Sequence, residues 1–343
     1  MPTALITGVS GEVLTPAETA FLKRAAPCGL ILFDRNCRDH DQIRALVESV
    51  KDALACGDIL VLIDQEGGRV QRLRPPLGRA LPPALAYALL YEQDPENARQ
   101  AAFLAARLVA RDLRALGINT NCAPVLDLPV EGAHTIIGDR AYGTRPAEVA
   151  TLGRAVSEGF LAGGVLPVVK HIPGHGRATK DSHLDLPVVT ASRDVLSATD
   201  FAPFRMLADM PAAMTAHVVF TAVDPEAPAS TSEVVTREVI RGEIGFDGLL
   251  MSDDLSMKAL RGTLRARAEA VIGAGSDLAL HCNGDLAEME EAASGVPVLA
   301  GKARERFERA LGLLETNVAF DVARAEACLA SAIAIGSRRT ESV

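Results

Sequence analysis

LPVVKH, residues 166–171, is a short apolar run that ends in two ionisable residues. Seven similar aliphatic or β-branched runs occur along the chain, at residues 4–9, 29–33, 59–64, 118–124, 212–218, 248–253 and 276–282. Helical patterns separate them, for example at residues 40–55 and 97–117. Eight alternations of strand and helix within 343 residues are typical of an α/β fold, the (β/α)₈ TIM-type barrel. We therefore predict this barrel.

The same pattern predicts a single domain. No linker or shift in composition divides the chain, so we expect residues 1–343 to form one catalytic barrel, with about ten frayed residues at the C-terminus. A doubly wound parallel sheet is the alternative, but the sequence contains no G-x-G-x-x-G motif. A helix over residues 230–245 is expected to begin at Ser230 or Ser232 and to end at Gly245.

The composition fits a barrel core and narrows the class of partner. Hydrophobic residues make up 48% of the chain, aromatic residues only 4%, and Trp is absent, which suits parallel strands covered by helices. The net charge is −9 and no basic stripe occurs, so we expect neither nucleic acid nor a membrane surface as a partner. The sequence does not specify an oligomeric state, and a monomer is favoured.

Three further features favour a cytoplasmic protein. No segment approaches the roughly 18 apolar residues of a membrane helix. The chain begins almost at the first predicted strand and lacks the basic and apolar regions of a signal peptide. Six cysteines are scattered without a C-x-x-C pair, so we expect free, reduced thiols.

Polar residues gather where the predicted strands end. They are Asp64, Asn119 to Asp127, Lys170 and His171, His217, Asp253 and Asp254, and His281 to Asn283. The carboxyl ends of the strands meet at one mouth of a barrel, where barrel enzymes keep their active sites. Ionisable residues at the carboxyl ends of otherwise apolar strands therefore indicate that the protein is an enzyme.

A metal-dependent hydrolase is one reading of these residues. His171 and His175 are four residues apart, which would place both on one face of a helix. Pro173 and the neighbouring glycines make a helix there improbable. Asp181, His183, Asp253 and His281 could still assemble a metal site across loops, so this alternative stays open.

Proton transfer and nucleophilic attack are the second reading. Asp181 lies two residues before His183 in a glycine-flanked loop. A carboxylate bonded to one imidazole nitrogen raises the basicity of the other, which yields a general acid/base, whereas the alternative is a solvated surface loop. In SDD, residues 252–254, Asp254 could cap the next helix while the other aspartate acts as a carboxylate nucleophile.

Carboxylates and arginines alternate in two further segments. IDQEGGRVQRL contains Asp64, Glu66, Arg69 and Arg72, and IIGDRAYGT contains Asp139 and Arg140. Such pairs suit sugar hydroxyls, which both donate and accept hydrogen bonds. A purely structural network of salt bridges is the alternative.

Eight ordered segments together resemble one family. They are GLILFDRN, LIDQEGGRVQRL, GINTNCAPVLDL, IIGDRAYG, VVKHIPGHG, DSHLDLP, SDDLSM and AGSDLALHCNG. Over roughly residues 1–310 the chain is similar to the short bacterial β-N-acetylglucosaminidases of glycoside hydrolase family three, which act in cell-wall recycling. The resemblance implies a retaining enzyme that removes non-reducing terminal N-acetylglucosamine from small carbohydrates, namely muropeptides, without a cofactor or metal.

The resemblance also implies a role for each matching residue. Asp253 is expected to be the nucleophile, and His183 the general acid/base, oriented by Asp181. The sugar-binding positions are Asp64, Arg72, Arg140, Lys170 and His171, with His217 near them on weaker support. Retaining glycosidases generally use two carboxylates, and here a histidine replaces the second. Because a neutral imidazole adds no negative charge, phosphate could also act as acceptor, so glycoside phosphorylase activity stays open.

Overall fold

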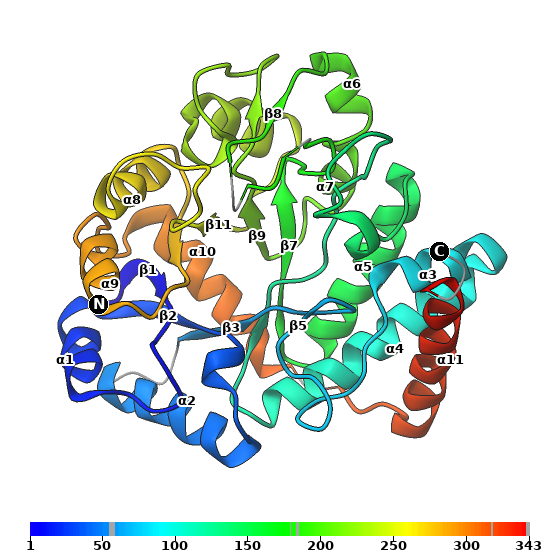
Figure 1. Ribbon diagram of the computed structural model, residues 1–343, viewed down its shortest axis with the longest axis horizontal. Helices are drawn as coiled ribbons and strands as arrows, with labels where there is room; N and C mark the ends of the chain where they lie inside the picture. The colour runs from blue at the N-terminus through cyan, green and yellow to red at the C-terminus, as the bar shows by residue number, and fades with distance from the viewer. Residues whose placement is uncertain (55–58, 179, 183–184, 317, 341–343) are drawn as a thin grey trace.

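The computed structural model contains a closed barrel of eight parallel strands (Figure 1). It describes residues 1–54, 59–178, 180–182, 185–316 and 318–340. The strands are β1 (Thr3–Thr7), β2 (Pro27–Leu32), β3 (Leu60–Ile63), β6 (Thr120–Asn121), β7 (Leu166–Ile172), β9 (Ala212–Thr215), β11 (Leu249–Asp254) and β12 (Leu278–His281). The first strand pairs with both β2 and β12, which closes the barrel. The predicted fold class is confirmed.

Helices surround this barrel, and α2 and α4 lie close to the helices predicted over residues 40–55 and 97–117. The main ones are α1 (Pro16–Ala25), α2 (His40–Leu54), α3 (Ala84–Gln93), α4 (Pro95–Arg114), α5 (Pro146–Ala162), α8 (Leu264–Gly273), α9 (Leu286–Ala293), α10 (Gly301–Gly312) and α11 (Val322–Thr340). Figure 1 shows α11 beside α3 and α4. The regular backbone of α11 reaches Thr340, and residues 341–343 lie outside the described part of the chain.

The helix predicted over residues 230–245 is present and has π-type winding in η4 (Val235–Glu243). The Ser232 hydroxyl accepts a hydrogen bond from the Val235 amide at 3.0 Å, so Ser232 caps the helix start. Ser230 instead lies 2.7 Å from a ring nitrogen of His217. Gly245 follows the helix with a φ of 77°, the left-handed conformation that glycine adopts at little cost.

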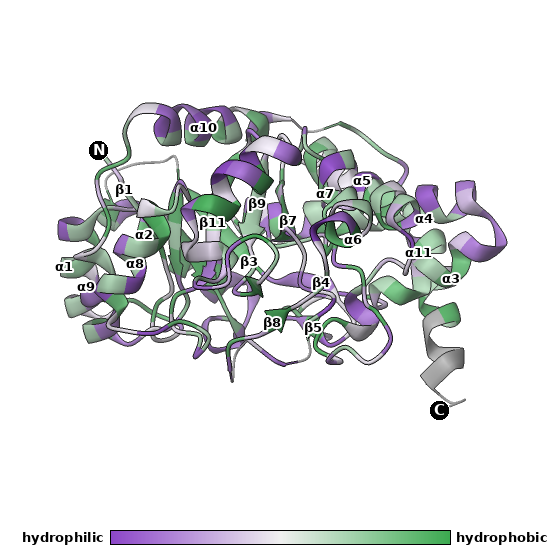
Figure 2. Cartoon of the chain, turned by 90° about the horizontal axis from the view of Figure 1, so that it is seen from above, coloured by the Kyte–Doolittle hydropathy of each residue, from purple (hydrophilic) through white to green (hydrophobic). Residues whose placement is uncertain are grey.

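The side chains of each barrel strand alternate between two apolar layers. Along β7, Leu166 and Val168 pack inside the barrel, whereas Val169 packs in the layer between strands and helices. Along β11, Leu249 and Met251 point inward and Leu250 outward. Figure 2 shows hydrophobic residues along the strands and hydrophilic ones on outer helices such as α10. Side chains alternate with a period of two along each strand. The inward-pointing residue that follows the last apolar one therefore lies at the mouth of the barrel.

Two features of the fold bear on expectations about the environment of the chain. The five cysteines within the described ranges, Cys28, Cys37, Cys122, Cys282 and Cys328, form no disulfide. Cys56 lies outside those ranges. Of the helices in the described residues, none combines the length and the apolar character needed to cross a membrane.

Candidate active site

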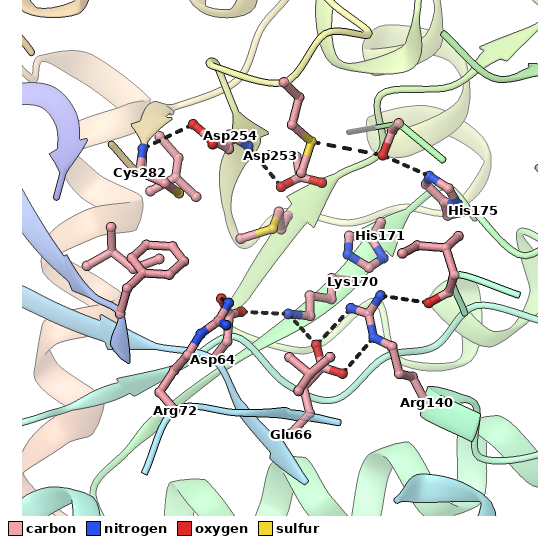
Figure 3. Close-up of a pocket in the computed structure, with 18 of the residues that line it drawn as sticks. Asp64, Glu66, Arg72, Arg140, Lys170, His171, His175, Asp253, Asp254 and Cys282 are labelled. Atoms are coloured by element: carbon pink, nitrogen blue, oxygen red, sulfur yellow. Dashed lines mark hydrogen bonds and ion pairs between the residues drawn. The ribbon is translucent and has the colours of Figure 1, made fainter. Parts of the chain in front are cut away.

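A cavity of about 400 Å³ opens at the carboxyl ends of the barrel strands (Figure 3). Its lining includes six of the side chains predicted for the site, Asp64, Arg72, Arg140, Lys170, His171 and Asp253. Inward alternation explains three of them, because Asp64 follows Leu60 and Leu62, Lys170 follows Leu166 and Val168, and Asp253 follows Leu249 and Met251. The polar residues at the ends of β3, β7 and β11 therefore converge on one pocket.

One wall of the pocket is a chain of alternating charges. Lys170 Nζ lies 2.9 Å from Asp64 Oδ1 and 2.7 Å from Glu66 Oε1. Arg72 Nη2 donates to Asp64 Oδ2 at 3.0 Å, and Arg140 binds Glu66 through Nε and Nη2, both at 2.8 Å. Figure 3 shows these five side chains, here named the charged wall, linked in one network. The wall presents fixed donors and acceptors to any ligand in the cavity.

The charged wall stays ionised although it is buried. Burial alone would raise the pKa of Glu66, but Arg140 and Lys170 lower it to about 2. Burial likewise opposes the ionisation of Asp64, and the adjacent Lys170 and Arg72 hold its pKa well below the ordinary value. The same carboxylates raise the pKa of Lys170 against the effect of burial. Each charge is therefore maintained by its neighbours.

Arg69 and Asp139 form a separate pair at the rim. Their side chains are 44% and 38% exposed, and Arg69 Nε lies 2.9 Å from Asp139 Oδ1. Asp139 is thus the partner of Arg69, while Arg140, its neighbour in the sequence, binds Glu66. The structure separates an exposed surface pair from the buried pairs of the charged wall.

Asp253 lies across the cavity from the charged wall (Figure 3). The residue is 8% exposed, and its Oδ1 accepts a hydrogen bond of 2.8 Å from the Asp254 amide. Burial would raise the pKa of Asp253, but the nearby His171 and the Asp254 amide lower it below its ordinary value. Asp253 is therefore an ionised carboxylate at the edge of the pocket, as a nucleophile requires.

Asp254 has a different role from the helix cap suggested by the sequence. Its carboxylate accepts hydrogen bonds from the amides of Ser256 and Cys282, each at 3.0 Å. The next helix, α8, begins at Leu264 and is capped by Thr263. The helix-cap interpretation was wrong because a turn and a loop intervene; Asp254 instead ties the end of β11 to the end of β12.

His171 lies in β7 and His175 in the irregular segment that follows it, so they do not share a helix face. Their ring centroids are 5.7 Å apart. His171 Nδ1 lies 2.7 Å from Asp127 Oδ2, and His175 Nε2 lies 3.3 Å from the Ser182 hydroxyl. Burial, reinforced by His171, lowers the pKa of His175 to about 4. Across the described ranges, no three His, Cys, Asp or Glu side chains come together in a way that could hold a metal ion.

Ser182 and Asp181 are the described residues of the segment in which the acid/base was predicted. Ser182 is 3% exposed and lines the pocket. Asp181 is half-buried, and its carbonyl accepts a hydrogen bond from the Asp185 amide at 3.0 Å. His183, predicted as the acid/base, lies outside the described residues.

His217 does not line the cavity. Its ring is 0% exposed, with Nδ1 2.7 Å from the Ser230 hydroxyl and Nε2 3.0 Å from the Asp254 carbonyl. Because a carbonyl only accepts, Nε2 donates and Nδ1 accepts from Ser230. Both ring nitrogens have protein partners, so the geometry gives His217 a bracing position beneath the end of β11 and offers no support for a direct sugar contact.

Two buried carboxylates of the site were not assigned roles from the sequence. Glu66 was noted only as one of several acids near arginines, yet it joins Arg140 to Lys170. Asp127 was noted only as a polar residue after the fourth strand, yet it is 0% exposed and binds His171. Glu66 lies two residues beyond Asp64, a spacing that could have signalled it. Nothing local to residue 127 indicates its partner.

A parallel barrel with a charged pocket at its strand ends defines the chain as a TIM-barrel enzyme. The sequence model of the glycosyl hydrolase family 3 N-terminal domain matches residues 11–311, and the chain belongs to this family.

Named relatives agree with this assignment. A β-hexosaminidase from Alkalilimnicola ehrlichii is 42% identical over 283 residues, which cover 81% of this chain and 80% of the relative. A β-hexosaminidase from Bordetella pertussis is 38% identical over 291 residues, which cover 84% of this chain and 82% of the relative. Among solved structures, NagZ from Neisseria gonorrhoeae in complex with N-trifluoroacetyl-D-glucosamine has a TM-score of 0.84 and 31% identity, covering 98% of both chains.

Proposed function

We propose that the chain is a retaining β-N-acetylglucosaminidase that removes non-reducing terminal N-acetylglucosamine from small carbohydrates. One observation carries the proposal: the ionised Asp253 faces the charged wall across a single cavity of about 400 Å³. The names of the family 3 relatives support a hexosaminide as substrate, and the solved Neisseria gonorrhoeae relative binds an N-acylated glucosamine.

In the first step Asp253 attacks the anomeric carbon of the bound sugar. The bond to the leaving oxygen breaks, and His183 donates its proton to that oxygen, so a glycosyl ester of Asp253 remains. Asp181 orients the imidazole and stabilises its protonated form. In the second step neutral His183 takes a proton from water, whose oxygen attacks the anomeric carbon and displaces Asp253. Two inversions give net retention.

The charged wall binds the sugar in this scheme. Hydroxyl groups can accept from Arg72 and Lys170 and donate to Asp64, because these groups are held at fixed positions by one another. His171, which lines the cavity between Lys170 and Asp253, supplies a further polar contact. The sugar ring is thereby held with its anomeric carbon toward Asp253.

The physiological setting forms part of the proposal. We place the enzyme in the cytoplasm as a monomer that acts on muropeptides derived from peptidoglycan. Five free cysteines are consistent with a reducing compartment. Residues 1–343 are taken as one catalytic unit, since the cavity draws its lining from Ile31 to Asn283.

Turnover of a chromogenic aryl β-N-acetylglucosaminide tests the proposal. We expect release of the aryl group by the wild type, loss of at least about 10⁴-fold in Asp253→Asn, and near wild-type turnover in the rim control Asp139→Asn. Activity should survive dialysis against a chelator. No turnover, or turnover that Asp253→Asn retains, contradicts the proposal; loss with the chelator favours a metal-dependent hydrolase. Repeating the assay in phosphate and analysing the sugar product separates hydrolysis from phosphorolysis.

A further inference from the structure

Asp127 is the most enclosed carboxylate near the active site. It lies beyond β6 (Thr120–Asn121), is 0% exposed, and does not line the cavity. Three hydrogen bonds converge on it: the amides of His171 and His175 donate to Oδ1 at 3.1 and 2.7 Å, and His171 Nδ1 lies 2.7 Å from Oδ2. Buried carboxylates are costly unless they are paired in this way.

The contact with His171 fixes which ring nitrogen carries a proton. Burial would raise the pKa of Asp127, but the His171 side chain, together with His175 and its amide, lowers it below the ordinary value, so Asp127 is ionised. An ionised carboxylate only accepts, and therefore Nδ1 of His171 must hold the proton. The opposite nitrogen, Nε2, is left for the cavity that the ring lines.

The two amide contacts hold the backbone on which that ring is mounted. Oδ1 of Asp127 joins His171, one residue before the end of β7, to His175, four positions later. In the same turn, a side chain at Gly176 would place its Cβ 1.9 Å from the Leu128 carbonyl oxygen, so the turn lies directly against the segment that carries Asp127. His175 in turn reaches Ser182, beside the proposed acid/base.

We propose that Asp127 is a positioning residue that keeps the His171 imidazole in the Nδ1–H form and presents Nε2 to the sugar. Neutral His171 then accepts a hydrogen bond from a sugar hydroxyl at Nε2, and protonated His171 donates one, with the ring in the same orientation. This inference rests on the proposed function for the identity of the ligand, but not for the state of the ring.

Asp127→Asn keeps the shape of the side chain. It separates the contacts with the two backbone amides from the contact with the His171 ring. The amide oxygen of Asn can still accept from the amides of His171 and His175. Its NH₂ group, however, would face Nδ1 of His171 and can only donate. The neutral imidazole must then move its proton to Nε2, so the atom offered to the sugar changes from acceptor to donor.

Nitrogen NMR of ¹⁵N-histidine-labelled protein, titrated with pH, reads this state directly, and a His171→Ala spectrum assigns the signals. We expect Nδ1 of His171 to carry a proton at every pH in the wild type and to lose it at high pH in Asp127→Asn. Asp277→Asn is the control for loss of a buried carboxylate elsewhere, because Asp277 is 5% exposed and binds Arg241, Arg306 and the Leu250 amide near the start of β11. In the spectrum of Asp277→Asn, the His171 signals should match those of the wild type.

Kinetics on the aryl N-acetylglucosaminide complete the test. Asp127→Asn should lower kcat/KM by about 10- to 100-fold in the wild-type background. In a His171→Ala background the same substitution should change kcat/KM little, because the ring through which it acts is gone. A thermal melt confirms that each variant is folded.

Two results overturn the inference: an unprotonated Nδ1 in the wild type, or equal kinetic losses in both backgrounds, which would assign Asp127 to the backbone turn alone. A wild type that does not turn over the glycoside contradicts the proposed function instead, while the NMR result still decides the role of Asp127.

Discussion

At the scale of single residues, the active site depends on buried charges that maintain one another. Glu66 and Arg140 have side chains only 8% and 10% exposed, and Lys170 is 3% exposed. Removing Glu66 leaves the buried Arg140 without its carboxylate partner and Lys170 with Asp64 alone, which is far more costly than breaking an exposed pair. The charged wall should therefore fail as a unit.

Glu66→Gln tests this coupling. We expect the free energy of unfolding to fall by about 3 kcal/mol or more, because Arg140 and Lys170 lose a shared buried carboxylate. Asp139→Asn, which breaks the exposed pair with Arg69, should cost at most about 1 kcal/mol. Urea unfolding of both variants measures the difference. Equal losses would show that the charged wall is no more interdependent than the surface pair.

His183→Ala tests general acid catalysis through the choice of leaving group. A sugar alkoxide needs a proton to leave, so the variant should lose about 10²–10⁴-fold on a sugar aglycone. A nitrophenolate leaves nearly unaided, and glycosylation with that substrate should suffer much less. Pre-steady-state bursts on both substrates give the two rates. If glycosylation slows equally on both, His183 binds the sugar and the acid lies elsewhere.

At the scale of elements, an ion pair joins the segment after β7 to Asp200. Arg177 Nε lies 2.6 Å from Asp200 Oδ2, and its Nη2 donates to the Thr199 hydroxyl at 3.0 Å. Asp200 is 2% exposed, and burial raises its pKa despite the contacts with Thr199 and Arg177. Arg177 lies four residues before Asp181 in the chain.

Arg177→Met should loosen that segment. We expect faster hydrogen exchange in the peptide covering residues 174–182, and a lower kcat on a sugar aglycone than on an aryl glycoside. Asp200→Asn removes the buried charge and keeps the shape of the side chain. It should therefore lower the free energy of unfolding less than Arg177→Met does. Unchanged exchange in Arg177→Met would show that the ion pair does not anchor the segment.

The elements also show what could be predicted from the sequence. The ends of β3, β7 and β11 were predictable, because apolar alternation with a period of two sets the direction of Asp64, Lys170 and Asp253. The spacing from Asp64 could have placed Glu66 near the pocket, but not its pairing with Arg140, which lies 74 residues away. The role of Asp127 was not predictable, since its partner His171 lies 44 residues away. The assignment of Asp254 as a helix cap failed because the sequence gives no length for the loop before α8.

At the scale of the whole molecule, buried histidines make stability depend on pH. Burial lowers the pKa of His175 to about 4 and also lowers the pKa values of His217 and His281. Below the unfolded value of about 6.5, the unfolded chain binds protons that the folded chain excludes. The free energy of unfolding should therefore fall as the pH drops from about 6.5 toward 4, above the range where most carboxylates titrate.

His175→Gln isolates one of these contributions. Because His175 stays neutral in the folded protein, it should lower the free energy of unfolding of the wild type by about 2 kcal/mol between pH 8 and pH 5. His175→Gln lacks this contribution, so its free energy of unfolding should fall by that much less over the same interval. Urea unfolding at pH 8 and pH 5 gives both differences, and any direct effect of the substitution cancels. A parallel decline in the two proteins would show that His175 is not kept neutral by burial.

The central claim is that Asp253 forms a bond to the sugar, and peptide mass spectrometry tests it most directly. The protein is incubated with a slow mechanism-based fluoro-sugar derived from N-acetylglucosamine, digested and analysed for a glycosyl adduct. Asp253→Asn serves as the control that cannot form the ester. We expect the added mass on the peptide that contains Asp253, in the wild type alone. Substrate turnover without an adduct, through an oxazoline formed by the sugar's own acetamido group, would contradict the claim.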